Sequence, residues 1–211
     1  MYKYILWDHD GVLVDTEYWY FQATRKALSE INIDLKKSTY MEYMIAGKSC
    51  WDLANVAGIG TSKIEKKRAD RDNYYQKHLA EENIEIPGVE KILSLLSQKY
   101  KMAIVTTSKR RDFDLIHQRR NIVAYMEFVA TREDYLNSKP DPEPYLYGLE
   151  KLGAKKSDTL VIEDSQRGLS SARAAGIDCA MIHNDFTASH DFSGAKYFLK
   201  SLQELPDLLN Q

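Results

Sequence analysis

Short apolar runs alternate with helical stripes along most of this chain. The runs predict buried strands, and they lie at 2–7, 101–106, 126–130, 159–162, 179–182 and 197–199. Between them, apolar residues recur at the spacing of one helix face, which predicts helices at 88–96, around 113–116, at 142–152 and at 169–175. Strands that alternate with helices favour a parallel sheet covered on both faces. The pattern therefore predicts an α/β core.

The segment that follows the first run has a different pattern. Between Asp15 and Asn83 the apolar positions follow helical spacing, with Ser38 as the candidate N-cap of one helix and Thr61 as the start of another. An all-helical block that interrupts an α/β pattern is typical of an inserted cap domain. We expect a discontinuous core of residues 1–16 and 85–211 and a cap of residues 17–84.

Composition narrows the class of protein. The chain has 211 residues, with 29 Lys and Arg against 31 Asp and Glu, which disfavours nucleic acid as the main partner. No apolar run approaches the ~18 residues that span a bilayer, and the first residues lack an apolar signal-peptide core. The two cysteines, Cys50 and Cys179, give neither a disulfide framework nor zinc spacing. We expect a cytoplasmic protein that binds neither membrane nor nucleic acid.

Polar side chains gather where the predicted strands end, and parallel sheets bind ligands at that edge. The residues there are Asp8, Asp10, Thr106, Thr107, Ser108, Glu163 and Asp164, and Lys139 precedes the helix at 142–152. Carboxylates crowded together repel one another unless a cation is bound. Because the ligands are hard oxygens, the expected cation is Mg²⁺.

These residues also resemble a known family. The segment from Asp8 to Glu17 (DHDGVLVDTE) resembles the first motif of the haloacid dehalogenase-like (HAD) superfamily. Thr106 resembles the second motif, Lys139 in SKPDPEPY the third, and Glu163-Asp164 in TLVIEDSQRGL the fourth. The motifs occur in family order, and the resemblance covers nearly the full length. It implies the HAD fold, a Rossmann-like parallel sheet with an inserted helical cap.

The resemblance also implies a mechanism. Asp8 is the expected nucleophile, which forms an aspartyl-phosphate, and Asp10 is the expected general acid and base. Thr106 is expected to donate a hydrogen bond to the transferred phosphoryl group, and Lys139 to offset its negative charge. The expected Mg²⁺ ligands are Asp8, the Asp10 backbone carbonyl and Asp164, with Glu163 as a ligand or as a partner of the ligands. Glu163 is alternatively a helix N-terminal charge.

The substrate class follows from Asp10, because the dehalogenase and phosphonatase branches lack this second Asp. The resemblance is nearest to the branch of β-phosphoglucomutases and small sugar-phosphate phosphatases. We therefore expect a monomeric Mg²⁺-dependent phosphatase that hydrolyses a small phosphorylated metabolite. Candidate substrate-binding residues are Thr107 and Ser108 in the core and Lys48 and Tyr20 in the cap.

Alternative functions remain open. A phosphosugar mutase needs cap cations for a second phosphate, yet by resemblance Ala46 and Cys50 occupy the positions of the mutase Lys and Arg, which favours a hydrolase. Lys48 is left as a substitute for one of these cations. A catalytically silent binding protein of the same fold would be expected to lack one of the motif residues, and all are present. A dinucleotide-dependent dehydrogenase is disfavoured because no G-x-G-x-x-G follows the first strand.

The motifs do not assign a role to His9, to Ser165 or to the aromatic side chains of the cap. His9 departs from the apolar residue common in its slot of the family, and we interpret it as a side chain that faces the cap or supports the site from behind. Ser165 is the expected N-cap of the helix at 169–175. The cap aromatics, such as Trp51, are expected to pack the cap helices more than to line an entrance.

Overall fold

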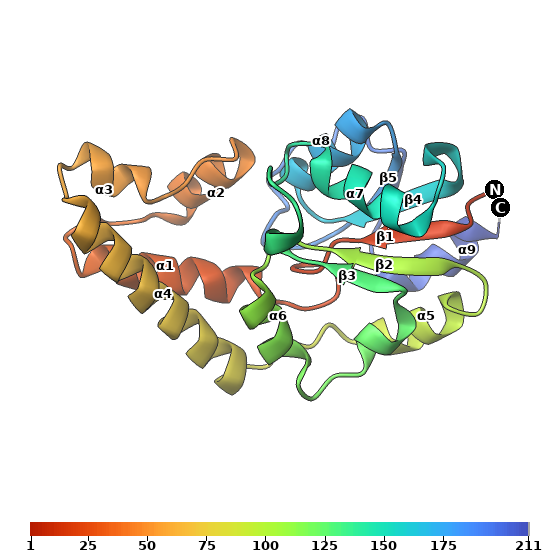
Figure 1. Ribbon diagram of the computed structural model, residues 1–211, viewed down its shortest axis with the longest axis horizontal. Helices are drawn as coiled ribbons and strands as arrows, with labels where there is room; N and C mark the ends of the chain where they lie inside the picture. Colours follow the sequence, from red (N-terminus) through yellow and green to blue (C-terminus); the bar gives the residue numbers. More distant parts are fainter. Residues whose placement is uncertain (211) are drawn as a thin grey trace. The chain divides into compact units, whose positions relative to one another are not determined.

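The computed structural model describes residues 1–210, which form two compact units. One unit joins Met1–Asp15 to the chain from Glu85 onward, and it contains the sheet. The other is Thr16–Ile84, which is built from helices (Figure 1). The boundary thus falls one residue earlier than the sequence pattern suggests.

The sheet unit is built on six parallel strands, as the apolar runs predict. They are β1 (Tyr4–Trp7), β2 (Lys101–Val105), β3 (Phe128–Ala130), β4 (Thr159–Glu163), β5 (Asp178–Ile182) and β6 (Tyr197–Leu199). Their order is β3-β2-β1-β4-β5-β6, and each neighbouring pair is parallel. Ile5 on β1 is in register with Met102 on β2 and Leu160 on β4. The predicted α/β fold with a Rossmann-like sheet is confirmed.

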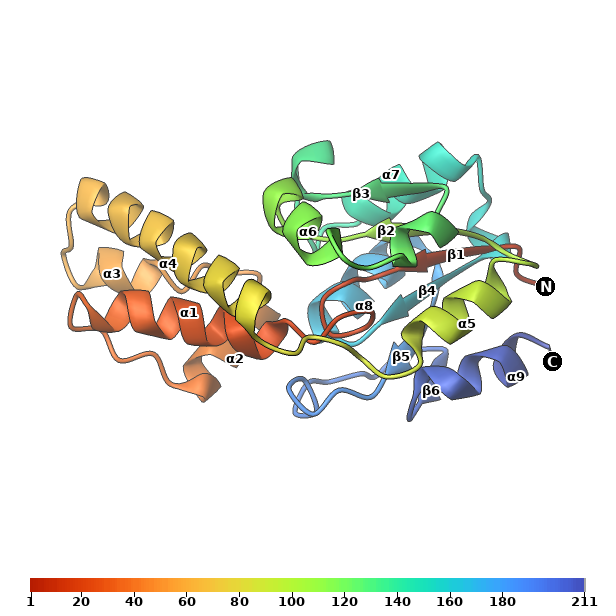
Figure 2. The ribbon, with the colours of Figure 1, turned by 90° about the horizontal axis from the view of Figure 1, so that it is seen from below.

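Helices cover both faces of this sheet. They are α5 (Val89–Leu96), α6 (Arg110–His117), α7 (Glu143–Leu152), α8 (Gln166–Ala175) and α9 (Leu205–Leu209), with short 3-10 turns at Ile122–Tyr125, Arg132–Asp134, Lys156–Asp158 and Leu202–Glu204. Figures 1 and 2 show α7 and α8 on one face and α5 and α9 on the other. No helix among residues 1–210 is long and apolar enough to cross a membrane.

Alternation along β1 divides the apolar core into two clusters. Ile5 and Trp7 point toward the cluster that includes Leu93 and Phe113, while Leu6 points toward the cluster that includes Tyr145. This follows from the pleat, because successive side chains of a strand point to opposite faces. The same alternation decides which helix each residue beyond β1 can approach.

The helical unit consists of α1 (Glu17–Ser29), α2 (Lys37–Ile45), α3 (Asp52–Val56) and α4 (Thr61–Glu81). Its longest helix, α4, begins at Thr61 as predicted and buries Ile64, Arg71, Tyr75 and Leu79. Arg71 is 7% exposed, and its guanidinium donates to Tyr20 Oη and, at 2.8 Å, to Asp72. These bonds satisfy a charge that would otherwise be costly to bury.

One predicted helix cap was wrong. α2 begins at Lys37, and Lys36 occupies the N-cap position with extended backbone (φ −74°, ψ 150°), so Ser38 lies inside the helix. The preceding Leu35 is fully buried. Packing of Leu35 fixes where the chain turns into the helix, and this outweighs the preference of a serine hydroxyl for the cap.

Most of the aromatic side chains among Tyr18, Trp19, Tyr20 and Trp51 pack within the helical unit. Trp51 is 4% exposed, and the Tyr20 ring lies edge-on against Tyr75 with a centroid distance of 5.1 Å. The Trp19 ring stacks on His78 at 5.0 Å. Tyr18, by contrast, is 43% exposed. Packing is therefore the main role of these rings, as expected.

Close packing of α7 on the sheet gives a first prediction. A Cβ at Gly148 would lie 3.0 Å from Val105 Cγ2 and 3.1 Å from both methyls of Leu6, which is fully buried. We expect Gly148→Ala to lower the free energy of unfolding by about 1–2 kcal/mol, because overpacking costs about 1–3 kcal/mol and helix propensity returns up to about 1 kcal/mol. Urea denaturation of the purified protein measures this change.

A double-mutant cycle separates the clash from other effects. Leu6→Ala alone should cost about 2–5 kcal/mol, and adding Gly148→Ala to it should cost less than in the wild type, because the cavity accepts the new methyl group. Strictly additive costs would show that α7 does not press on Leu6.

Candidate active site

The order of the sheet reverses at β1, which has β2 on one side and β4 on the other. In open parallel sheets such a switch point opens a crevice at the carboxyl ends of the strands. Asp8 directly follows β1, and its backbone N–H donates to the Ile162 carbonyl of β4 at 2.9 Å. This bond extends the pairing by one residue and brings Asp8 beside Glu163 and Asp164.

Three buried carboxylates meet at this point. Asp8 is 9% exposed, Glu163 is fully buried and Asp164 is 1% exposed. One oxygen from each lies within 4.8 Å of the others, so together they could hold a metal ion. The donor set is oxygen only, which suits Mg²⁺ better than a softer metal.

Lys139 neutralises part of this charge. Its ammonium donates to Asp8 Oδ1 at 2.6 Å, to Glu163 Oε1 at 3.0 Å and to the Val105 carbonyl at 2.9 Å. The side chain is 2% exposed, and its nitrogen lies 4.5 Å from the centre of the Tyr145 ring. All three N–H groups are therefore used on protein acceptors, and one of them holds Asp8 in place.

Glu163 is enclosed by donors. Its Oε1 accepts from Lys139 and from Tyr145 Oη at 2.8 Å, and its Oε2 accepts from the backbone N–H groups of Asp164 and Ser165 and from the Ser165 hydroxyl. Ser165 is the N-cap of α8, as predicted, because its Oγ accepts from the Gly168 N–H at 3.1 Å. Glu163 thus lies at a helix N-terminus, where negative charge is favourable.

Glycine makes this arrangement sterically feasible. A Cβ at Gly168 would lie 1.6 Å from Glu163 Oε1, so any side chain there would displace the carboxylate. At Gly11, φ is +84°, and a Cβ would lie 2.2 Å from Asp164 Oδ2. Glycine is therefore needed at position 11 for two reasons: the backbone there is left-handed, and Asp164 approaches it closely.

Burial and neighbouring charge shift the ionisation of the cluster. Burial, followed by the charge of Glu163, raises the pKa of Asp8 to about 6, and the ammonium of Lys139 opposes this rise. Burial opposes the charged form of Lys139 as well, but the carboxylates of Asp8 and Glu163 raise its pKa above the ordinary value. Although burial disfavours ionised Glu163, Lys139 and the Tyr145 hydroxyl lower its pKa. These shifts favour a charged ammonium among carboxylates.

Asp10 is held by a separate set of donors. Its Oδ2 accepts from Ser108 Oγ at 2.6 Å and from Thr106 Oγ1 at 3.1 Å, and it lies 3.2 Å from His9 Nδ1. Thr106 in turn accepts from the Ser108 N–H at 3.0 Å. The turn that follows β2 therefore holds the Asp10 carboxyl group through two hydrogen bonds. Asp10, Thr106 and Ser108 lie together, as their positions at the strand ends suggested.

The structure adds residues that the sequence did not single out. Arg167 donates to Thr107 Oγ1 at 3.3 Å, and Asn184 donates to Asp164 Oδ2 at 2.9 Å. Tyr145 supports both Lys139 and Glu163. Arg167 follows Asp164 by three residues, inside the segment TLVIEDSQRGL, so its position was a usable signal. Tyr145 is the last residue of the SKPDPEPY segment, so that motif was a usable signal for it as well, whereas Asn184 reaches the site through tertiary packing and no motif contains it.

Two of the predicted substrate-binding residues, Lys48 and Tyr20, belong to the helical unit. Lys48 is exposed and follows α2. Tyr20 accepts a hydrogen bond from Arg71, whose guanidinium lies 4.5 Å from the centre of its ring. Tyr20 therefore has a structural role inside the helical unit, and substrate binding by Tyr20 and Lys48 stays a prediction.

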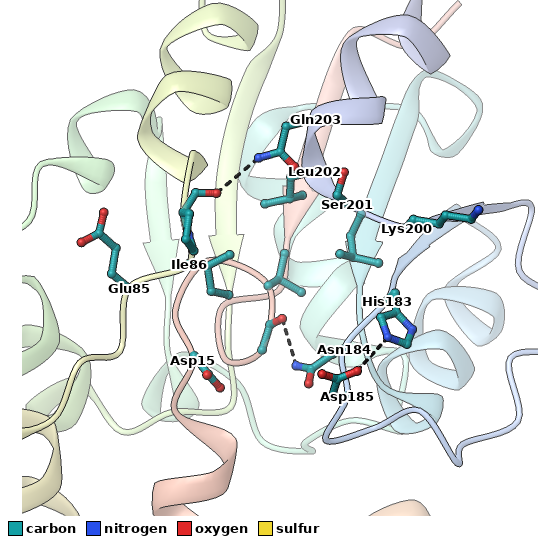
Figure 3. A pocket seen from close by; sticks show the side chains of 14 residues that line it. Asp15, Glu85, Ile86, His183, Asn184, Asp185, Lys200, Ser201, Leu202 and Gln203 are labelled. Carbon is teal, nitrogen blue, oxygen red and sulfur yellow. Dashed lines mark hydrogen bonds and ion pairs between the residues drawn. The ribbon is translucent and has the colours of Figure 1, made fainter.

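A pocket of about 320 Å³ lies beside the acidic cluster in the sheet unit (Figure 3). Asn184 points from its wall toward the Gly11 carbonyl, to which it donates at 3.1 Å. Other lining residues are Asp15, Glu85, Ile86, Pro87, His183, Asp185, Lys200, Ser201, Leu202 and Gln203. None of the three clustered carboxylates lines this pocket, so it is distinct from the candidate metal site.

Comparison with known proteins finds related chains and similar folds. A phosphorylated carbohydrates phosphatase of Thermotoga maritima is 29% identical over 178 residues, which cover 82% of each chain. Protein CbbY of Rhodobacter capsulatus is 28% identical and covers 98% of each chain. The crystal structure of CbbY from Rhodobacter sphaeroides in complex with phosphate superposes with a TM-score of 0.82 at 21% identity, covering 97% of this chain and 96% of that one.

The family resemblance of the four motifs is confirmed by a match that spans most of the chain. Residues 5–182 match the family described as haloacid dehalogenase-like hydrolase, a range that includes the carboxylate cluster, Lys139 and Asp10. The protein belongs to the haloacid dehalogenase-like hydrolase family.

Proposed function

We propose that this hydrolase is a Mg²⁺-dependent phosphatase that cleaves a small phosphomonoester through an aspartyl-phosphate on Asp8. The observation that carries the proposal is the position of Asp8, at the switch point of the sheet and 2.6 Å from the ammonium of Lys139. The relatives named as phosphatases, one of them for phosphorylated carbohydrates, support the substrate class. A sugar phosphate or a similar small metabolite is the expected substrate.

In the first step, an oxygen of Asp8 attacks phosphorus and the bond from phosphorus to the substrate oxygen breaks. Asp10 gives a proton to that oxygen, which leaves as an alcohol. In the second step, Asp10 takes a proton from water as the water attacks the aspartyl-phosphate. The bond between phosphorus and Asp8 then breaks, inorganic phosphate leaves, and both carboxyl groups return to their starting states.

Lys139 serves this chemistry by holding the nucleophile. Its charge keeps Asp8 ionised against the opposing effect of burial, and its three hydrogen bonds fix the direction of the attacking oxygen. Thr106 and Ser108 fix Asp10 in the same way. A contact from Thr106 to the transferred phosphoryl group, as the motif implies, is part of this proposal.

The charge of the cluster fits a divalent cation. Three carboxylates share one ammonium, so a second cation lowers the repulsion that burial intensifies. Asp8 and Asp164 are the proposed side-chain ligands, together with the Asp10 backbone carbonyl. Glu163 is close enough to be a ligand, but its five hydrogen bonds favour a role in holding Lys139 and the α8 terminus. When bound, Mg²⁺ neutralises charge on the transferred phosphoryl group.

Replacement of the nucleophile is the most direct test. We expect Asp8→Asn to lower phosphate release from sugar phosphates by roughly 10³-fold or more, because loss of a nucleophile removes the covalent route. Asp178→Asn is the matched control, since Asp178 begins β5 at the opposite edge of the sheet. A variant Asp8→Asn that keeps near wild-type turnover would show that another group attacks phosphorus.

Metal removal gives a second test. A chelator should abolish phosphate release, and added Mg²⁺ should restore it. Asp164→Asn should raise the Mg²⁺ concentration needed for half-maximal activity by about tenfold or more, because a ligand is lost. Phosphate release that is unchanged in metal-free buffer would contradict a metal-dependent mechanism.

The mutase alternative is tested by following both products. A mutase must anchor a second phosphate, yet Ala46 and Cys50 carry no charge, and Arg71 is bound by Tyr20 and Asp72. We expect β-glucose 1-phosphate to yield inorganic phosphate, if it is accepted, and no glucose 6-phosphate in a dehydrogenase-coupled assay. Glucose 1,6-bisphosphate should not activate the protein. Formation of glucose 6-phosphate would make the protein a mutase.

A further inference from the structure

His9 is a fully buried polar side chain between two residues of the active site. It continues the face of Ile5 and Trp7, so its ring packs against α6 rather than beside Lys139. The centroid of the ring lies 4.8 Å from that of Phe113 and 5.1 Å from that of His117. Because a buried polar group is costly unless it is hydrogen-bonded, each of the two ring nitrogens of His9 is expected to have a partner.

Both nitrogens have partners. His9 Nδ1 lies 3.2 Å from Asp10 Oδ2, and His9 Nε2 lies 2.8 Å from His117 Nε2. The contacts form a line that runs from the last residue of α6 through His9 to the carboxylate of Asp10. His117 is half-buried, and within residues 1–210 its Nδ1 is buried with no hydrogen-bond partner.

Chemistry fixes where the protons lie along this line. Asp10 Oδ2 is an acceptor, since Thr106 and Ser108 both donate to it, so His9 Nδ1 carries the proton that bonds Asp10. The Nε2 of a neutral His9 is then an acceptor, and His117 Nε2 must donate to it. This leaves His117 Nδ1 without a proton, which suits an atom that faces no acceptor. Burial is the main cause that lowers the pKa of His117 to about 3, in keeping with a neutral His117 ring.

We infer that His9 and His117 are a positioning pair that holds the Asp10 carboxyl group for proton transfer to the leaving oxygen. The pair completes a set of three donors on Asp10 Oδ2, with Thr106 and Ser108 supplying the other two from the turn after β2. Donors from two elements fix the plane of the carboxyl group, and the exchanged proton then belongs to Oδ1. The inference rests on the proposed function, because it assumes that Asp10 is the general acid.

Amide variants separate the two contacts of His9. The amide nitrogen of asparagine occupies the position of Nδ1, whereas that of glutamine occupies the position of Nε2. His9→Asn therefore keeps a donor to Asp10, while His9→Gln keeps only the side that faces His117. By the same reasoning, His117→Gln keeps the donor to His9, and His117→Leu removes it.

Leaving groups of different quality reveal whether proton transfer is affected. A sugar alkoxide needs a proton to leave, whereas p-nitrophenolate does not. We expect His9→Gln to lower kcat for a sugar phosphate by about tenfold to a hundredfold, the order that general acid catalysis contributes. The kcat for p-nitrophenyl phosphate and the KM for both substrates should stay within about threefold of wild type. His9→Asn and His117→Gln should stay near wild type, with His117→Leu in between.

Phe113→Leu is the packing control, because Phe113 contacts both imidazole rings. It should lower the melting temperature without changing the ratio of kcat values for the two substrates. If the histidines have a purely structural role, His9→Gln should also leave this ratio unchanged. The kcat values for both substrates would then fall equally, or neither would fall. That result would overturn the inference and leave the phosphatase intact.

A spectroscopic measurement does not depend on activity. The ¹⁵N chemical shifts of the wild-type imidazoles should show His9 neutral and protonated on Nδ1, and His117 neutral and protonated on Nε2. A His9 ring protonated on Nε2 alone would overturn the inference whatever the enzyme hydrolyses. If wild-type protein with the expected ¹⁵N shifts released no phosphate from any compound, the proposed function would fail, and the inferred catalytic role with it.

Discussion

Burial of several carboxylates beside one ammonium is the constraint on which the rest of this site depends. Charged groups removed from water are unstable unless hydrogen bonds and opposite charges replace the lost solvent. Glu163 accepts five hydrogen bonds, and Lys139 spends all three of its N–H groups on protein acceptors. Glycines at 11 and 168 leave the space that the carboxylates occupy. The negative charge that remains uncompensated is what makes this edge of the sheet suited to a cation.

The same edge divides into two functional sides because β1 is the central strand. Asp8 faces β4 and Lys139, where charge is concentrated and direct ionic contact controls ionisation. Asp10 faces the turn after β2, where two hydroxyls and the His9 imidazole contact its Oδ2. In the proposed mechanism, Asp8 as nucleophile must stay ionised, whereas Asp10 as general acid must carry and release a proton. Distinct environments two residues apart suit these opposite demands.

Much of this arrangement was predictable, and the exceptions have a common cause. Strand ends and family motifs pointed to Asp8, Asp10, Lys139 and the acidic pair, because a parallel sheet gathers the ends of its strands at one edge. His117 was not predictable, since its 108-residue separation from His9 is closed only by packing of α6 on the sheet. Ser38 failed as a cap for a related reason, because the buried Leu35 sets the helix start. Local rules fail where tertiary packing decides.

The helical unit bears on specificity through how its own charges are used. Arg71 is buried and bound by Tyr20 and Asp72, and the ammonium of Lys67 is bound by Glu30 and Asp70. These cations stabilise the unit rather than offer a rigid anchor for an anion. An enzyme that transfers phosphate between two positions of one sugar must anchor the second phosphate while the first reacts, and that requires a fixed cation. An enzyme that hydrolyses a monoester has no second phosphate to anchor, so the use of Arg71 and Lys67 within the helical unit is compatible with a hydrolase.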